Sequence, residues 1–133
     1  MMLPKGANVA VADGEKLSYF ENTGDEANLK LVERPLGAID DHGKGSGSRQ
    51  ASAGNPDESQ SREDGFSTGV VQRLNAEVLG GSIQHLVIIA APRALGEMRK
   101  HYHKELSSRL LGEISKDLTG HSLLDIEKAI AAA

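Results

Sequence analysis

Short runs of apolar residues, separated by turn-forming residues, open the chain and predict strands. Residues 8–12 (Asn-Val-Ala-Val-Ala) end in Asp13 and Gly14, and a second apolar run, residues 17–20, follows directly. An Asp-Gly pair adopts the positive φ angles of tight turns, so the two runs are predicted to pair as a hairpin. Residues 29–34 alternate apolar and charged side chains before Pro35, as in a half-buried strand. The sequence therefore predicts three antiparallel strands at its start.

Helical periodicity appears in the second half of the chain. One apolar stripe, ended by a Gly-Gly pair at residues 80–81, consists of Phe66, Val70, Leu74 and Val78. Residues 86–91 (Leu-Val-Ile-Ile-Ala-Ala) show no alternation, which predicts a central strand with Ile88 fully buried. Pro92 suits the first turn of a following helix. The apolar face of that helix is predicted to hold Leu95, Met98 and Tyr102. A strand that leads into a helix is typical of α/β folds.

Residues 106–118 fit two patterns. The helical period is matched by Leu106, Leu110, Ile114 and Leu118. Alternate positions 110, 112 and 114 also fit one face of a strand, and Gly112 weakens the helical interpretation. Periodicity slightly favours a helix, and the strand remains open. Beyond this segment, Ser122 begins a sequence that resembles a capping box. The buried side of the final helix is predicted to consist of Leu123, Ile126 and Ile130.

Residues 36–64 differ in composition from both flanking regions. Gly, Ser, Asp, Asn, Gln and charged residues dominate, and Ile39 is the segment's one β-branched aliphatic residue. Burial of so few apolar groups does not compensate for the entropy lost on ordering. The segment is therefore predicted to be a flexible loop within a single domain spanning residues 1–133. A functional loop and a merely disordered one are equally consistent with this composition.

Composition excludes several classes of protein. The 133 residues include no cysteine, which rules out disulfides, thiolate metal sites and a cysteine nucleophile, and fits a cytoplasmic location. No apolar run approaches the ~20 residues that span a bilayer, so membrane insertion is not expected. The formal net charge of −4 argues against broad, nonspecific binding of nucleic acid but permits a local basic patch.

Candidate catalytic groups are few. Asp13, Asp40 and Asp41 are the carboxylates to test for a two-metal nuclease, but a hairpin turn and loop solvation are their simpler roles. His101 and His103 form the one close histidine pair. On a helix, residues two apart point to nearly opposite sides, so a structural role is favoured over metal binding. The sequence therefore assigns no catalytic residue, metal or cofactor.

A glycine-rich segment at residues 43–50 is the most distinctive local feature. It reads Gly-Lys-Gly-Ser-Gly-Ser-Arg-Gln and does not match a phosphate-binding P-loop. Its composition favours a flexible tether. The alternative is that its backbone amides, with Lys44 and Arg49, contact phosphates.

Four segments carry a family resemblance. They are residues 11–14 (Val-Ala-Asp-Gly), 91–99 (Ala-Pro-Arg-Ala-Leu-Gly-Glu-Met-Arg), 116–119 (Lys-Asp-Leu-Thr) and 125–128 (Asp-Ile-Glu-Lys). In order and spacing, over nearly the whole chain, they resemble the bacterial host attachment protein family, also called proteins required for attachment to host cells. That family is in turn distantly similar to the middle domain of the archaeal and eukaryotic peptide-chain release factor and to the related Pelota protein.

The resemblance implies a ribonuclease H-like α/β domain with a mixed sheet of about five strands. Three antiparallel strands are followed by helix, strand, helix, strand and helix, which makes residues 109–116 a strand. In the release factor, the loop after the third strand carries a Gly-Gly-Gln tripeptide that enters the ribosomal peptidyl-transferase centre. The corresponding residues 42–50 lack that tripeptide. Peptide release is therefore not implied, and Gln50 receives no catalytic role.

These observations favour a noncatalytic binding module over an enzyme, with ribosomal or other structured RNA as the candidate ligand. The residues predicted to contact its phosphates are Lys44, Arg49, Arg93, Arg99, Lys100 and Lys104. The alternative is a protein-interaction or regulatory module that acts indirectly in bacterial attachment to host cells. A nuclease or other hydrolase comes third, because a fold does not decide a function. The sequence indicates no oligomeric state.

Overall fold

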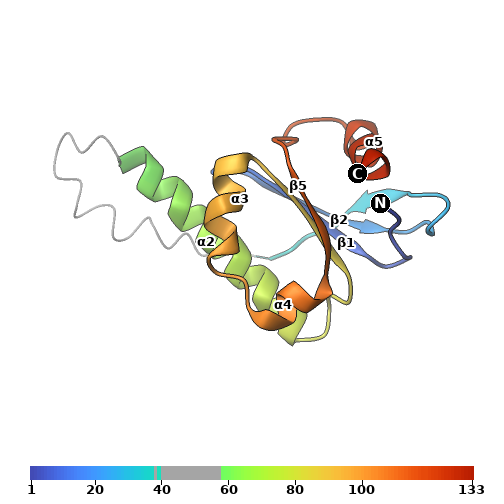
Figure 1. Ribbon diagram of the computed structural model, residues 1–133, viewed down its shortest axis with the longest axis horizontal. Coiled ribbons are helices and arrows are strands. Elements are labelled where there is room, and N and C mark those ends of the chain that lie inside the picture. Colours follow the sequence, from blue (N-terminus) through green and yellow to red (C-terminus); the bar gives the residue numbers. More distant parts are fainter. Residues whose placement is uncertain (38, 40–57) are drawn as a thin grey trace.

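A five-stranded sheet forms the centre of the computed structural model, which describes residues 1–37, 39 and 58–133 (Figure 1). The strands are β1 (Asn8–Ala12), β2 (Leu17–Asn22), β3 (Leu31–Glu33), β4 (Leu86–Ala90) and β5 (Leu110–Ser115). Their order across the sheet is β3-β2-β1-β4-β5. The pairs β1–β2 and β2–β3 are antiparallel, whereas β4 runs parallel to both β1 and β5. The predicted mixed sheet is confirmed.

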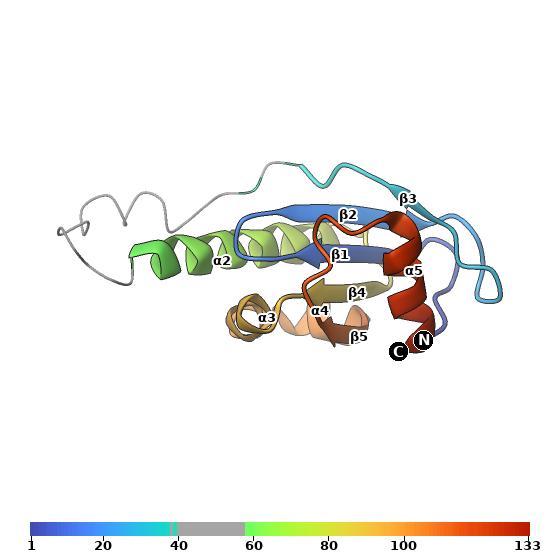
Figure 2. The same ribbon diagram turned by 90° about the horizontal axis from the view of Figure 1, so that it is seen from above.

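Helices cover both faces of this sheet (Figure 2). The described helices are α2 (Glu58–Leu79), α3 (Pro92–Arg99), α4 (Lys104–Arg109) and α5 (Leu123–Ala132). Buried residues of α2, α3 and α4 share one apolar cluster with one face of the sheet, and those of α5 share a second cluster with the other face. Within the described ranges, no helix is both long and apolar enough to cross a membrane.

The two central strands explain why these apolar runs form strands. All five residues of β1 and all five of β4 are buried. Successive side chains of a strand point to opposite faces. Ala10 and Ile88 accordingly lie in the cluster beneath α2, whereas Val9 and Val87 lie in the cluster beneath α5. Ile88 is 0% exposed, which confirms its predicted position.

The hairpin between β1 and β2 is confirmed, but its turn differs from the prediction. Gly14 does not adopt a positive φ, unlike four other glycines of the described chain. The turn instead spans residues 13–16, closed by a hydrogen bond from Asp13 N to Lys16 O of 3.1 Å. The Asp13 side chain accepts hydrogen bonds from the amides of Glu15 and Lys16. These bonds stabilise the turn, which was predicted to depend on a positive φ at glycine.

Helix α2 begins earlier than expected. It starts at Glu58, so the loop prediction is wrong for residues 58–64. Polar residues tolerate an exposed helical turn as readily as a loop, and composition alone does not separate the two. Leu36 and Ile39 also pack against the buried cluster, and Leu36 O accepts a hydrogen bond of 3.1 Å from Arg73 Nε. The remainder of the predicted loop, residues 38 and 40–57, lies outside the described residues.

The bounds of α3 and the start of α5 follow from local sequence. Pro92 opens α3, which ends at Arg99, so Tyr102 lies beyond the helix on which it was predicted. The Ser122 side chain accepts from Asp125 N at 3.1 Å and caps α5, as expected. Ile126 and Ile130 are buried, but Leu123 is 40% exposed, so that prediction is wrong. The buried cluster includes Ile126 and Ile130 but does not extend to the first turn of α5, where Leu123 lies.

The strand assignment for residues 109–116 is confirmed by β5, which follows the short helix α4. Its pairing with β4 is interrupted once. Leu86 faces Leu110 and Val87 faces Gly112, so Leu111 has no partner on β4. A Cβ on Gly112 would lie 2.6 Å from Cε of Met1, at the flexible end of that side chain.

Candidate functional site

The parallel strands β1, β4 and β5 end at one edge of the sheet. The connection after β4 leads to α3 over one face, and the connection after β5 leads to α5 over the other. Where neighbouring connections diverge to opposite faces, space opens beyond the strand ends, and ligands of α/β proteins commonly bind there. We call residues 13–16, 91–93 and 116–119 the carboxyl edge. Three of the four segments that carry the family resemblance converge on it.

Asp13 holds two parts of the carboxyl edge together. Its Oδ1 accepts hydrogen bonds from the amides of Glu15 (2.7 Å) and Lys16 (2.6 Å). Its Oδ2 accepts from the hydroxyl of Thr119 at 2.9 Å, and that hydroxyl also lies 2.6 Å from Oδ1 of Asp117. Burial raises the pKa of Asp13, but these hydrogen bonds outweigh it and lower the pKa below its ordinary value. Oδ1 of Asp13 therefore accepts two backbone hydrogen bonds, and Oδ2 shares the single hydroxyl proton of Thr119 with Asp117.

Asp13 thus has a second structural role besides the hairpin turn predicted from the sequence, because it also contacts Thr119. Sequence reasoning placed Asp13 in the hairpin and missed its contact with Thr119. No local pattern signals that contact, because 106 positions separate the two residues. Among the described residues, no group of three or more His, Cys, Asp or Glu side chains is arranged to hold a metal ion.

A small hollow of about 60 Å³ adjoins the carboxyl edge between α2 and α3. It is lined by Gly14, Gln60, Glu63, Asp64, Ser67, Ala91, Arg93 and Ala94. A Cβ on Gly14 would lie 2.8 Å from Cγ of Glu63, so glycine lets the hairpin approach α2. Asp64 accepts a hydrogen bond of 2.5 Å from Gln60. The hollow thus combines two carboxylates with one guanidinium.

The amino terminus of α3 lies at the mouth of this hollow. Ala91 provides no side-chain cap, and the first turn of α3 contains no acidic residue. The first backbone N–H groups of a helix have no intrahelical partner, and the helix dipole makes that end electropositive. Arg93 is exposed there and has no ion pair within the part of the chain that the structure describes. The amino terminus of α3 and the guanidinium of Arg93 together favour the binding of an anion.

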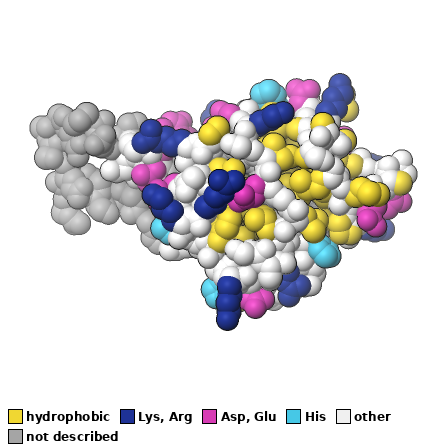
Figure 3. Space-filling model, viewed as in Figure 1, with side chains coloured by type: hydrophobic (Ala, Val, Ile, Leu, Met, Phe, Trp, Pro, Cys, Tyr) yellow, Lys and Arg dark blue, Asp and Glu magenta, His cyan; other side chains and the backbone are white. Residues whose placement is uncertain are grey.

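The other cations predicted around α3 differ in availability. Arg99 donates to Glu113 from Nε (3.0 Å) and Nη2 (2.8 Å), and Lys100 pairs with Glu97 at 3.1 Å. Lys104 is exposed at the start of α4. The four cations therefore do not form one unpaired patch, although Lys and Arg side chains gather over the amino-terminal part of α2 and over α3 (Figure 3). Lys44 and Arg49 lie outside the described residues.

Glu113 joins α3 to the outer strand β5. Besides Arg99, it accepts a hydrogen bond of 2.6 Å from the hydroxyl of Tyr102. Burial raises the pKa of Glu113, but the hydrogen bonds from Arg99 and Tyr102 lower it by more, so the pKa lies below its ordinary value. Burial and the same carboxylate raise the pKa of Tyr102. This cluster links α3 to β5, and it keeps the Arg99 guanidinium bound to Glu113.

The two candidate histidines have separate structural contacts. Nε2 of His101 lies 3.0 Å from Oε2 of Glu97 and 3.2 Å from the hydroxyl of Thr68, which joins α3 to α2. The hydrogen bond from His101, with the neighbouring ammonium of Lys100, holds the pKa of Glu97 below its ordinary value. His103 caps α4, because its Nδ1 accepts from the amide of Glu105 at 3.0 Å.

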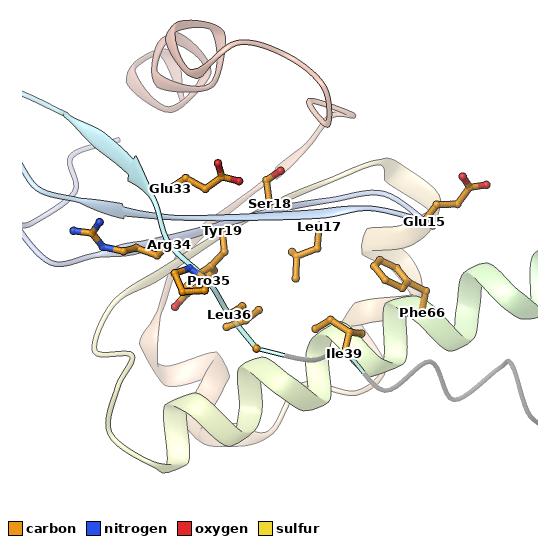
Figure 4. Close-up of a pocket in the computed structure, with 11 residues that line it drawn as sticks. Glu15, Leu17, Ser18, Tyr19, Glu33, Arg34, Pro35, Leu36, Ile39 and Phe66 are labelled. Atoms are coloured by element: carbon orange, nitrogen blue, oxygen red, sulfur yellow. The ribbon is translucent and has the colours of Figure 1, made fainter.

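A larger groove of about 420 Å³ lies between β2 and α2. Leu17 of β2 and Phe66 of α2 extend into the space between these elements, Tyr19 lies beside Pro35, and Leu36 and Ile39 lie between β2 and α2 (Figure 4). Apart from Pro35, these side chains belong to, or pack against, the buried cluster beneath α2. The groove is therefore a partly open margin of the core, without the cationic helix end found at the carboxyl edge.

Comparison with known families matches residues 7–130 to the model described as bacterial archaeo-eukaryotic release factor family 12. The match covers most of the chain and supports the release-factor part of the predicted resemblance. The name host attachment protein is not confirmed by it. A search of curated proteins finds no match.

Proposed function

Because the chain belongs to bacterial archaeo-eukaryotic release factor family 12, we propose that it is a noncatalytic module that binds ribosomal or other structured RNA at its carboxyl edge. The observation that carries this proposal is the uncapped amino terminus of α3 beside Arg93. Backbone amides at a helix amino terminus favour phosphate, and a guanidinium contacts two phosphate oxygens at once.

Neighbouring turns add charge to the same site. Lys16 follows β1 and Lys116 follows β5, and both are exposed, as are the neighbouring acidic residues Glu15 and Asp117. Glu63 and Asp64 oppose an anion from the side of α2. Phosphate would therefore approach from the Arg93 side of the hollow, and removal of the Glu63 charge should strengthen binding. The predicted contacts by Arg99, Lys100 and Lys104 would be weaker, because two of these three cations already have carboxylate partners.

A noncatalytic role is supported by the state of Asp13. Two backbone amides and the Thr119 hydroxyl orient the Asp13 carboxylate, which gives it a structural role between two turns. We therefore expect Asp13→Asn to leave RNA affinity unchanged. The contribution of Lys44 and Arg49 remains a prediction from sequence, as does a cytoplasmic location.

The test is RNA affinity measured across a salt series. Each phosphate contact contributes about 0.7 to 0.9 to the slope of log affinity against log salt concentration. Arg93→Ala and Lys116→Ala should each reduce that slope by about this amount, and Glu63→Gln should raise affinity. Lys30→Ala is the matched control, because Lys30 is exposed between β2 and β3, away from the carboxyl edge. Absence of RNA binding at low salt would refute the proposal.

The second candidate function is a protein-interaction or regulatory module, which is the alternative predicted from the sequence for an indirect role in attachment to host cells. Exposed leucines on α5 favour it: Leu123 and Leu124 leave apolar surface at its first turn. Purification from the native source with and without nuclease distinguishes the two functions. RNA or ribosomal subunits lost on nuclease treatment support the first candidate, and a discrete protein retained after treatment supports the second.

A further inference from the structure

The groove between β2 and α2 contains a hydroxyl group that is almost buried and has no hydrogen-bond partner. Tyr19 lines this groove, belongs to the buried cluster beneath α2, and is 8% exposed. Its hydroxyl forms no hydrogen bond with the residues that the structure describes. Burial of a hydroxyl without a hydrogen bond is unfavourable, so a partner is expected from a bound molecule.

The hydroxyl of Tyr19 is not sealed within the core. Among the described side chains, Nε of Arg109 is the one polar atom that is both closed to solvent and without a hydrogen bond. The Tyr19 hydroxyl also lacks a hydrogen bond but is not closed to solvent, so it opens on the groove that Tyr19 lines. Burial, together with the carboxylates of Glu77 and Glu21, raises the pKa of Tyr19. At neutral pH the hydroxyl therefore keeps its proton and is able to donate it.

Apolar side chains surround this donor. Leu17 and Phe66 extend into the groove, and Pro35, Leu36 and Ile39 lie along it (Figure 4). The volume of about 420 Å³ falls within the range of about 300–1,000 Å³ that is typical of small-molecule sites. Such sites are mostly apolar and hold a few polar groups that orient the ligand.

Two polar residues at the margin of the groove belong to the other face of the sheet. Ser18 is paired with Val11, and Glu33 is paired with Phe20. Val11 and Phe20 both lie in the cluster beneath α5. Directly paired residues point to the same face, so the side chains of Ser18 and Glu33 point away from α2, as Figure 4 shows.

The charged groups near the groove are compensated or lie outside it. Glu15 is exposed on the hairpin turn and points away from the groove (Figure 4). Arg34 Nε lies 3.1 Å from a carboxylate oxygen of Glu21, and Glu77 is paired with Arg73. The described walls therefore provide one hydrogen-bond donor within apolar surroundings and no uncompensated charge.

We propose that this groove binds an uncharged, largely apolar small molecule whose carbonyl or ether oxygen accepts a hydrogen bond from Tyr19. A charged ligand would lose its hydration against apolar walls without gaining an opposite charge. A ligand without an acceptor would leave the Tyr19 hydroxyl unpaired. This function is separate from RNA binding at the carboxyl edge and is tested separately.

The probe is prodan, an uncharged naphthalene ketone whose fluorescence depends on the polarity of its surroundings. Titration of the full chain should show saturable binding of one molecule per chain. Anilinonaphthalene sulfonate, an anionic dye, should bind at least about tenfold more weakly. Absence of saturable prodan binding, or equal affinity for the anionic dye, would overturn the proposal.

Tyr19→Phe removes the hydroxyl and keeps the ring. We expect about fivefold weaker binding of prodan, as for the loss of one neutral hydrogen bond, and no change for an alkylnaphthalene that lacks the ketone. Without ligand, the variant should be no less stable than wild type, because its hydroxyl has no partner to lose. Tyr102→Phe is the matched control, since the Tyr102 hydroxyl donates to Glu113, and it should leave prodan affinity unchanged. Unaltered prodan affinity in Tyr19→Phe would contradict the role given to this hydroxyl.

Leu17→Trp tests the location, because a larger side chain fills the space that the ligand needs. Saturable binding of prodan should be lost. Leu124→Ala is the control, since it alters apolar surface exposed on α5, and it should not change prodan binding. Binding that survives Leu17→Trp or disappears in Leu124→Ala would place the dye elsewhere and overturn the proposal. Tyr19→Phe decides the matter if Leu17→Trp does not fold.

Discussion

The hydroxyl of Thr119 donates a hydrogen bond of 2.9 Å to the carboxylate of Asp13, although 106 positions separate the two residues. Thr119 follows β5 and Asp13 follows β1, and β4 lies between these strands. The bond therefore spans the end of a third strand and fixes two turns of the carboxyl edge relative to each other. Its contribution to folding can be measured directly.

Thr119→Val removes the hydroxyl and keeps the side-chain shape. We expect the free energy of unfolding near neutral pH to fall by about 1 kcal/mol, because Asp13 is partly solvated and the bond is screened. The folded-state pKa of Asp13 is lowered, so this contribution is full above its ordinary value of 3.8 and is lost as pH falls through the lowered pKa.

Urea unfolding of both proteins near neutral pH and at a series of acid pH values tests this prediction. Thr23→Val is the matched control, because the Thr23 hydroxyl donates to the uncharged carbonyl oxygen of Lys30 at 3.1 Å. Its effect on stability should not change with pH. A Thr119→Val deficit that persists unchanged in acid would contradict the role assigned to the Asp13 carboxylate.

Glu113→Gln should also destabilise the protein in a pH-dependent way. The change replaces a charged acceptor of the Tyr102 hydroxyl with a neutral one, at a cost of about 1 kcal/mol near neutral pH. The pKa of Glu113 is lowered in the folded state, so the difference from wild type should shrink as pH falls through that pKa. Thermal unfolding at several pH values is the measurement, and a constant difference would refute the prediction.

Two glycines should respond differently to substitution by alanine. At Gly24, a Cβ would clash with the backbone carbonyl of Asn28, which cannot move without opening the β2–β3 turn. At Gly112, the clash is with the flexible end of Met1. We expect Gly24→Ala to cost at least about 1 kcal/mol more than Gly112→Ala. Chemical denaturation of the two variants decides this, and equal losses would count against it.

Ile88→Ala tests the centre of the sheet. The fully buried side chain leaves a cavity, and the expected loss of stability is about 2–5 kcal/mol. Leu124→Ala serves as the control, because Leu124 is exposed on α5, and its change should stay within about 0.5 kcal/mol. A loss below about 1 kcal/mol for Ile88→Ala would be inconsistent with a buried central strand.

The sequence predicts those parts of the fold in which neighbouring residues determine the outcome. An uninterrupted apolar run identifies β4, and Ser122 identifies the start of α5. The start of α2 is not predictable in this way, because residues 58–64 are polar and their helical state depends on continuation into the buried stripe. The exposure of Leu123 depends equally on where the core ends.

The candidate site was predictable only in part. Arg93 was identified from its place on α3, but the carboxylate partners of Arg99 and Lys100 were not. Glu97 is three positions from Lys100, so this ion pair follows from helical spacing. The pair between Arg99 and Glu113 depends on the position of β5 relative to α3, which periodicity left unresolved.

Leu111 has no partner on β4, and this irregularity lies in the strand at one margin of the sheet. A straight outer strand exposes a row of unpaired amides and carbonyls on which a strand of another molecule can align. An extra residue bends and twists such a strand and spoils the alignment. The bulge at Leu111 therefore acts against edge-to-edge aggregation in a protein that has exposed leucines close to its carboxyl terminus.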